Sequence, residues 1–424
     1  MAAHRQESNE EGSPALMIDP GRLRRTMEEM ARVGATPGGG VHRLTLSDAD
    51  REARDLFATW CKEAGLAVAV DDMGNMFARR PGAEASAPPA MLGSHLDSVP
   101  FGGRFDGALG VLAALEVARS LNDRGILTRR PIEVVNWTNE EGPRFPPAML
   151  GSGVFCGKYG RDWAYARRDG EGKRFGEELE RIGYRGPVPC RPRPLGGYLE
   201  LHIEQGPVLE SEGVQVGAVE GIVGIVWLRV TMKGERDHAG PTPMSMRRDA
   251  LVGAARAIAA IREIPGKLHP DMVATVGEMS VSPNAINVIP DRAAFSVDFR
   301  HSDEGLMRRA REMVMETVED AARGEKLEVS VEEVGGSTAL PFHPEAVGAV
   351  AGACREAGYT FRRMWSAAGH DARYTAELGP AAMIFIPCTG GKSHTEIEDA
   401  SWEDAARGCD VLARALITLA GRAG

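Results

Sequence analysis

The sequence has no long apolar run and no paired cysteine motif. No apolar segment approaches the ~18 residues that a membrane-spanning helix needs, and the first fifteen residues are polar and acidic, without the apolar stretch of a secretory signal. Six cysteines are scattered without a C-x-x-C pair, which argues against a disulfide framework and against a thiolate zinc site. These absences predict a cytoplasmic protein in which histidine and carboxylate side chains would hold any metal.

The overall charge of the chain is negative. The 60 acidic residues outnumber the 50 basic ones, and the formal net charge of -10 argues against binding to nucleic acid or to anionic membranes. A small-molecule partner is therefore favoured. Because 424 residues are too many for one ordinary core, we expect two domains, or one large domain with a substantial insertion.

Two familiar enzyme motifs are missing. There is no H-E-x-x-H helix, which disfavours thermolysin-type chemistry. The segment "TGGKS" resembles the end of a phosphate-binding loop, but that motif requires glycine where Ile386 stands. Nucleotide binding through such a loop is therefore rejected.

The first part of the chain has the pattern of an α/β domain. Helices are expected near residues 20–33 and 47–65, and a hairpin at 66–80. "PAMLGSHLDS", "DGALGVLAALEVARSL" and "PIEVVNWTNEE" then read as strand, helix and strand, which is a βαβ unit. With the apolar strands "GYLELHIEQG" and "AAMIFIPCTGG", this predicts a mainly parallel sheet with helices on both faces.

A second domain interrupts the first. Between about residues 216 and 334 the pattern is strand, helix, strand, strand, helix, strand, which is typical of an inserted α+β (βαββαβ), ferredoxin-like domain. The predicted segments are a flexible tail at 1–18, a catalytic domain at 19–215 and 335–424, and the insert at 216–334.

Polar residues follow the strands of the first domain. Because ligands in open α/β sheets bind outside the carboxyl ends of the strands, residues distant in sequence would meet there. Imidazole and carboxylate together suit a pair of divalent ions, such as zinc, cobalt, nickel or manganese, with the aspartate as the shared ligand. The residues concerned are His95, Asp106, Glu140, Glu141, His202 and His394.

Each of these residues also has an ordinary structural explanation. Asp106, at the start of an apolar helix, could be a helix N-cap, and a single histidine near a strand end is usually a satisfied polar residue. The tandem Glu140 and Glu141 decide between the two explanations. Buried like charges are costly unless they are paired or metal-bound, so this pair indicates a cation.

Seven motifs, in a similarity that runs from about Asp19 to the C-terminus, resemble one enzyme family. The chain is similar to the zinc-dependent N-carbamoyl-amino-acid hydrolases, β-ureidopropionases and allantoate amidohydrolases, a branch of the aminoacylase-like metallopeptidase superfamily. The motifs are "GSHLDSVPFGGRFDGALGVLAALE", "NWTNEEGPRFPPAMLGSGVF", "LELHIEQGPVLE", "DHAGPTPMSMRRDA", "NAINVIPDRAAFSVDFRHSD", "SAAGHDA" and "GGKSHTE".

This resemblance implies a centre of two divalent ions, with zinc expected and manganese, cobalt or nickel as alternatives. His95, Asp106 and His202 would hold one ion. Asp106, Glu141 and His394 would hold the other.

The resemblance also implies the catalytic groups. Glu140 would be the general base, and Asp97 would orient a metal-binding imidazole from outside the ligand shell. His238 resembles the residue that, in related dimers, reaches toward the active site of a partner subunit and stabilises the oxyanion. Without the resemblance, His238 would read as a turn residue before two prolines.

Five residues resemble substrate contacts of the family. Asn287 and Arg300 would clamp the substrate carboxylate, although a cap and a solvated strand residue are the plain alternatives. Ala367 stands where relatives usually carry glycine, which leaves the neighbouring loop geometry open. The other expected contacts are Gln205, Gly369 and His370.

The implied activity is hydrolysis of a non-peptide C–N bond in a linear amide. The ureido bond of an N-carbamoyl α-L- or β-amino acid would be cleaved by a metal-bridging water, releasing amino acid, carbon dioxide and ammonia. Allantoate is the alternative substrate, and an N-acyl amino acid is less favoured. A non-catalytic ligand binder is disfavoured, since it would need Glu141 but not Glu140. The family also implies a homodimer, with the insert as lid and dimer interface.

Overall fold

The computed structural model describes residues 17–423, so the predicted flexible tail at 1–18 lies almost wholly outside the described residues. Two compact units make up this range. The first contains the residues up to Glu220, Phe342–Met364 and the residues from Gly369 onward, and the second contains Gly221–Pro341 and Trp365–Ala368. Within residues 17–423, no helix has both the length and the apolar character needed to cross a membrane.

The larger sheet has nine strands and a parallel centre. Its order is β1-β2-β4-β3-β5-β16-β6-β14, with β15 also paired to β6. The four central strands β4, β3, β5 and β16 run parallel, while the flanking pairs are antiparallel. This confirms the predicted α/β class with a mainly parallel sheet. The strands are β1 (Ala67–Val70), β2 (Met76–Arg80), β3 (Ala90–His95), β4 (Ile132–Trp137), β5 (Gly197–Ile203), β6 (Val216–Ile222), β14 (Leu340–Pro341), β15 (Phe361–Ser366) and β16 (Ala381–Ile386).

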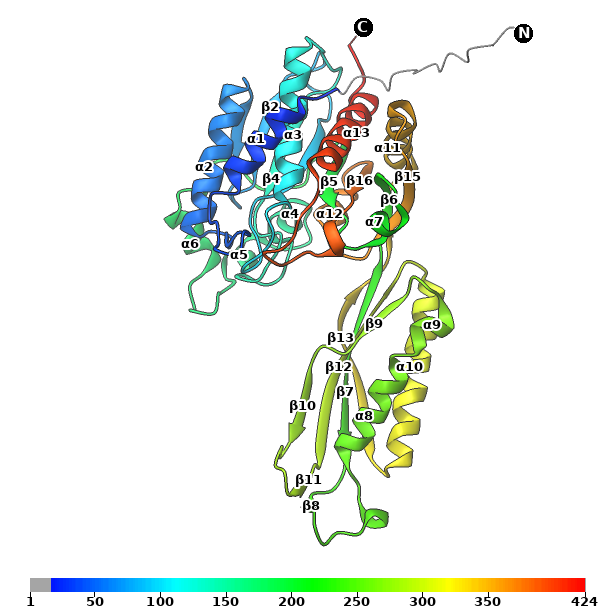
Figure 1. Cartoon of the computed structure of the whole chain (residues 1–424). Coiled ribbons are helices and arrows are strands. Elements are labelled where there is room, and N and C mark those ends of the chain that lie inside the picture. Colours follow the sequence, from blue (N-terminus) through cyan, green and yellow to red (C-terminus); the bar gives the residue numbers. More distant parts are fainter. Residues whose placement is uncertain (1–16, 424) are drawn as a thin grey trace, which may run out of the picture. The chain divides into compact units, whose positions relative to one another are not determined.

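Long helices pack together over this sheet. Figure 1 shows α1 (Pro20–Met30), α3 (Ala108–Asp123) and α13 (Trp402–Ala420), which contact one another, and α11 (Pro344–Ala357) packs on α13. α3 is buried along nearly its whole length because small and aliphatic residues occupy most of its positions. Outside this group, Ser47 caps α2 (Asp48–Glu63) through a hydrogen bond from the backbone N–H of Asp50.

Short helices fill the long connections of the first unit. Residues of three of these helices and of nearby loops form a separate apolar cluster, which includes Leu46, Phe145, Phe175 and Leu179. This cluster anchors the loop that follows β4, which carries the tandem glutamates. The short helices are α4 (Leu150–Phe155), α5 (Arg161–Tyr165), α6 (Phe175–Arg181), α7 (Val208–Glu212), α12 (Ala372–Thr375) and η2 (Thr389–Gly391).

The second unit is an antiparallel sheet with helices on one face (Figure 1). Its strand order is β10-β12-β7-β13, with β9 also beside β12, and α8 and α10 pack on β7 and β12. The elements are β7 (Gly224–Lys233), β8 (Asp237–His238), η1 (Met244–Met246), α8 (Ala250–Ile261), α9 (Ile264–Leu268), β9 (Val273–Thr275), β10 (Met279–Ser282), β11 (Val288–Ile289), β12 (Arg292–His301), α10 (Glu304–Gly324) and β13 (Glu328–Ser337).

Two details of this region differ from the sequence prediction. The strand expected at residues 272–282 is divided into β9 and β10, because Thr275 pairs with Asp298 while Met279 pairs with Phe295, so one extra residue must bulge out. The second difference concerns β6. It pairs with β16 in the larger sheet, so the second unit begins at Gly221 rather than at residue 216.

Candidate metal centre

The ends of the central strands bring together residues that are far apart in sequence. His95 is the last residue of β3, His202 lies near the end of β5, and the tandem glutamates follow β4. Two groups of side chains place their ligand atoms within 4.8 Å of one another. The first group is His95, Asp106 and His202, and the second is Asp106, Glu141 and His394.

Asp106 offers one oxygen to each group. Its Oδ1 lies 3.5 Å from His95 Nε2 and 3.1 Å from His202 Nε2. Its Oδ2 lies 3.5 Å from His394 Nε2, which is in turn 3.4 Å from Glu141 Oε2. The carboxylate of Asp106 therefore has the geometry of a group shared by two cations.

Hydrogen bonds fix how two of the imidazoles face Asp106. His95 Nδ1 lies 2.9 Å from the Asp97 carbonyl oxygen, and His202 Nδ1 lies 2.9 Å from that of Ile203. An Nδ1–H donating to each carbonyl leaves the Nε2 lone pair for a cation. Gly107 N–H also donates to His202 Nε2 at 3.2 Å, which is consistent with this tautomer.

The charge of the site also fits bound cations. Burial raises the pKa of Glu141 well above its usual value, and the negative charge of Asp106 adds to the shift. Burial opposes a charge on His95, yet Glu140 and the other surrounding carboxylates raise the pKa of this imidazole well above its usual value. Glu141 Oε1 is buried and has no hydrogen-bond partner. An excess of buried carboxylate with an unpaired oxygen is the environment that a divalent ion neutralises.

Glu140 lies beside the two groups without belonging to either. It is 7% exposed, and its Oε2 lies 3.5 Å from His95 Nε2. Asn139 has a positive φ of 60°, and this turn lets adjacent glutamates face different partners. Burial, reinforced by Asp371 and Glu141, raises the pKa of Glu140 well above its usual value.

Asp97 supports both glutamates through their backbone. Its Oδ1 accepts a hydrogen bond from Glu140 N–H and its Oδ2 from Glu141 N–H, each at 3.3 Å. The nearest contact of its carboxylate with His95 Nδ1 is 3.9 Å, so Asp97 orients that ring chiefly through its carbonyl. The carboxylate of Asp97 therefore holds the backbone of the two glutamates.

The predicted substrate contacts and the predicted oxyanion-stabilising residue, His238, are divided between the two units. Gln205 Nε2 donates to Asp106 Oδ2 at 2.8 Å. The ring of His370, which follows Gly369, packs 4.6 Å from that of His202 between centroids, and burial lowers the pKa of His370 well below its usual value. His238, Asn287 and Arg300 belong to the second unit, where His238 and Asn287 are exposed.

Arg300 already has partners within its own unit. Its Nε and Nη2 donate to the Asp298 carboxylate at 3.0 and 2.7 Å, and its Nη1 donates to the Ala367 carbonyl at 2.9 Å. The guanidinium is therefore held in one orientation. A substrate carboxylate would have to share this group with Asp298 or displace it.

Three buried carboxylates near the centre were not singled out from the sequence. Glu200 accepts hydrogen bonds from Ser94 Oγ at 2.7 Å and Tyr198 O–H at 3.0 Å. Asp371 accepts from Ser152 Oγ, and Glu398 from the backbone of Asp106. For Glu200 a signal existed, because it shares a face of an otherwise apolar strand with His202.

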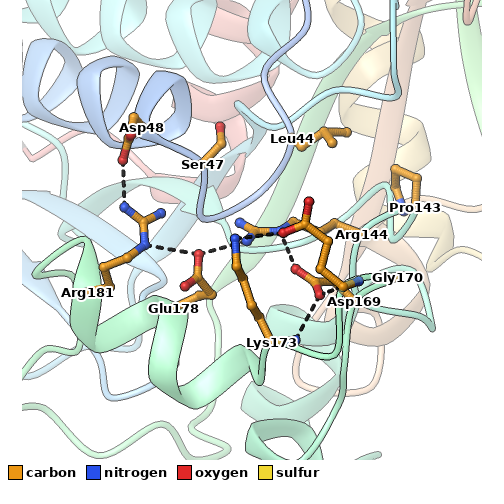
Figure 2. Close-up of a pocket in the computed structure, with 11 residues that line it drawn as sticks. Leu44, Ser47, Asp48, Pro143, Arg144, Asp169, Gly170, Lys173, Glu178 and Arg181 are labelled. Carbon is orange, nitrogen blue, oxygen red and sulfur yellow. Dashed lines mark hydrogen bonds and ion pairs between the residues drawn. The ribbon is translucent and has the colours of Figure 1, made fainter.

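A cavity of about 620 Å³ is lined in part by Pro143 and Arg144, which closely follow the tandem glutamates in the sequence (Figure 2). Arg144, three residues after Glu141, forms ion pairs with Asp169 at 3.1 Å and Glu178 at 2.7 Å. Arg181 pairs with Glu178 as well, at 3.0 Å. These charges satisfy one another, so the network anchors the glutamate loop to α6.

Comparison with known proteins places the chain in a family. Residues 91–418 match Peptidase family M20/M25/M40, and the chain belongs to this family. It is 45% identical to the N-carbamoyl-L-amino-acid amidohydrolase of Rhizobium meliloti over 95% of this chain and 97% of that protein. It is 33% identical to the allantoate amidohydrolase of Escherichia coli over 94% and 97%. The family resemblance predicted from the seven motifs is thus confirmed.

A solved structure agrees closely with this fold. The crystal structure of an amidase of the hydantoinase/carbamoylase family from Burkholderia multivorans has a TM-score of 0.92 and 49% sequence identity. The match covers 96% of this chain and 99% of that one.

Proposed function

We propose that the protein is a metal-dependent amidohydrolase that cleaves the ureido C–N bond of N-carbamoyl amino acids. The observation that carries this proposal is a carboxylate, Asp106, shared by two ligand groups, with Glu140 next to them. The similarity to an N-carbamoyl-L-amino-acid amidohydrolase supports the substrate class. Allantoate is the second candidate, because an allantoate amidohydrolase is also similar over nearly the whole chain.

The metal ligands and Glu140 have separate roles in this reaction. Divalent ions held by the two groups would supply positive charge that polarises the ureido carbonyl and acidifies water. Glu140 takes a proton from the attacking water, and its buried position strengthens it as a base. As the bond to the amino-acid nitrogen breaks, Glu140 returns that proton to the nitrogen. The carbamic acid released then decomposes to carbon dioxide and ammonia.

Ammonia release from a small substrate panel tests this function. N-carbamoyl-L-α-amino acids are expected to react fastest, compared with N-carbamoyl-β-alanine and allantoate. A chelator should abolish the reaction, and added zinc, cobalt or manganese should restore it. Release from allantoate alone would establish the second candidate, and no release from any substrate with any metal would contradict an enzyme of this type.

The resemblance supports further roles for the second unit. We assign oxyanion stabilisation to His238, and carboxylate binding to Asn287 and Arg300. We also propose that this ferredoxin-like unit acts as lid and dimerisation domain, that the protein is a cytoplasmic homodimer, and that its ions are zinc. Light scattering and elemental analysis of the purified protein test the dimer and the metal.

Arg300→Lys should raise KM about 10- to 100-fold while the metal content stays unchanged. Lysine keeps the charge but loses the planar fork that binds a carboxylate through two parallel hydrogen bonds, a loss of roughly 1.5–3 kcal/mol. Steady-state kinetics and elemental analysis measure the two quantities. Arg229→Lys on β7, at an exposed ion pair with Glu278, is the matched control. Unchanged turnover at low substrate concentration would remove Arg300 from substrate binding.

A further inference from the structure

Glu398 joins two segments that lie far apart in the sequence. The residue is 3% exposed. Oε1 accepts hydrogen bonds from the backbone N–H groups of Phe105 and Asp106, at 3.1 and 3.0 Å. Oε2 accepts a hydrogen bond from Ser393 Oγ at 2.9 Å. The two oxygens therefore link the segment that carries Asp106 to Ser393, the residue before His394. Asp106 and His394 are both candidate metal ligands.

The surrounding backbone leaves room for this carboxylate. A Cβ at Gly103 would lie 1.9 Å from Glu398 Cδ, so only glycine allows the Asp106 segment to approach this closely. The backbone N–H of Glu398 donates to the Thr395 carbonyl at 3.1 Å, which closes a turn directly after His394. Ser393 Oγ also lies 3.1 Å from Asp106 Oδ2, so the hydroxyl group bridges the two carboxylates.

His394 is the ligand that most needs such support. Its side chain is 52% exposed, whereas those of Asp106 and Glu141 are each 5% exposed. It has a φ of 56° and follows two glycines with positive φ, in a loop beyond the end of β16. Strand packing fixes His95 and His202, but it does not reach His394.

We propose that Glu398 is a positioning residue that holds Asp106 and His394 at the spacing required by the ion of the second group, without binding that ion itself. This inference rests on the proposed two-metal function. Asp106 has additional contacts with His95, His202 and Gln205. Loss of Glu398 should therefore weaken the second group more than the first.

Metal binding, measured separately from activity, tests the proposal. In Glu398→Ala, one ion per subunit should bind as in the wild type, and the second should bind 10- to 100-fold more weakly, the usual effect of removing a residue that orients metal ligands. Elemental analysis after equilibration at graded free-metal concentrations gives both affinities. Activity should return at high metal concentration, which a general folding defect would not allow.

Asp399→Asn is the matched control. Asp399 pairs with Arg104 at 2.8 Å and so links the same two segments, but at the surface, with the side chains 52% and 34% exposed. Its loss should change neither ion's affinity appreciably, because exposed ion pairs contribute little. If Glu398→Ala fails to fold, Glu398→Gln, which keeps one acceptor oxygen, should show the same selective weakening at smaller size.

Several outcomes would overturn the proposal. Unchanged affinity for both ions in Glu398→Ala, or equal weakening of both, would show that Glu398 does not position the second group selectively. These results leave the proposed function intact if the wild type binds two ions and hydrolyses its substrate. A wild type that binds fewer than two ions would contradict both.

Discussion

Replacing Glu140 by glutamine is expected to reduce hydrolysis by about 10²- to 10⁴-fold while both metal ions stay bound, since this is the usual contribution of a general base. The amide has nearly the same size as the carboxylate but cannot accept a proton from water. Glu140 belongs to neither ligand group, so its replacement should not alter metal content. Initial rates on the best substrate and elemental analysis of the same samples measure the two effects.

Glu141→Gln is the companion variant. The neighbouring carboxylate belongs to the second ligand group, 3.4 Å from His394 Nε2, so its loss should lower the metal content toward one ion per subunit. Adjacent residues of identical chemistry thus give different results. If both variants lose metal, or if both keep it, the proposed division between base and ligand is wrong.

Arg144→Met is expected to lower the free energy of unfolding by about 3–5 kcal/mol, because it removes the cation paired with nearly buried Asp169 and leaves Glu178 with Arg181 alone. Side-chain exposure is 12% for Arg144, 7% for Asp169 and 9% for Glu178. The guanidinium also donates to the Thr45 carbonyl at 3.0 Å. The variant should retain its secondary structure at neutral pH but unfold at lower denaturant concentration, as followed by circular dichroism.

The pH dependence gives a second measure of this network. Burial opposes ionisation of Glu178, but hydrogen bonds from Arg144 and Arg181 prevail and lower its pKa below the usual value. Such a group stabilises the fold above its unfolded-state pKa, and this stability is lost as pH falls through the lower, folded-state pKa. Arg144→Met should therefore lose less stability on acidification than the wild type.

Arg309→Met on α10 is the control for charge removal. Arg309 is 48% exposed and pairs with Glu312 and Glu316 on the surface. Its replacement should cost no more than about 1 kcal/mol. Equal destabilisation by the two substitutions would mean that the burial of Arg144 does not increase the contribution of its ion pairs to stability.

The central sheet was predictable because its strands are short, mainly apolar runs, and a strongly apolar helix separates β3 from β4. The same pattern located the candidate ligands, since residues at the carboxyl ends of parallel strands must come together. This rule alone was enough to predict the positions of His95 and His202. Asp106 and His394 lie in loops, so predicting their position required the additional expectation that a metal would draw loop residues to those strand ends.

Other features depend on contacts that no local pattern reveals. β6 (Val216–Ile222) was assigned to the inserted domain, but pairing with β16 makes it part of the larger sheet. Glu398 stands in an acidic run that resembles a solvated surface, and it is buried because backbone N–H groups nearly 300 residues earlier need an acceptor. The bulge between β9 and β10 likewise follows from the register of β12.

The position of β16 has a consequence for synthesis on the ribosome. This strand lies between β5 and β6 in the sheet, yet it is translated only after the whole of Gly221–Pro341. Until then, the nascent chain carries the unpaired edges of β5 and β6, which are templates for pairing with other chains. Slow translation or truncation before residue 381 should therefore favour aggregation, and chaperone demand should fall once β16 has emerged.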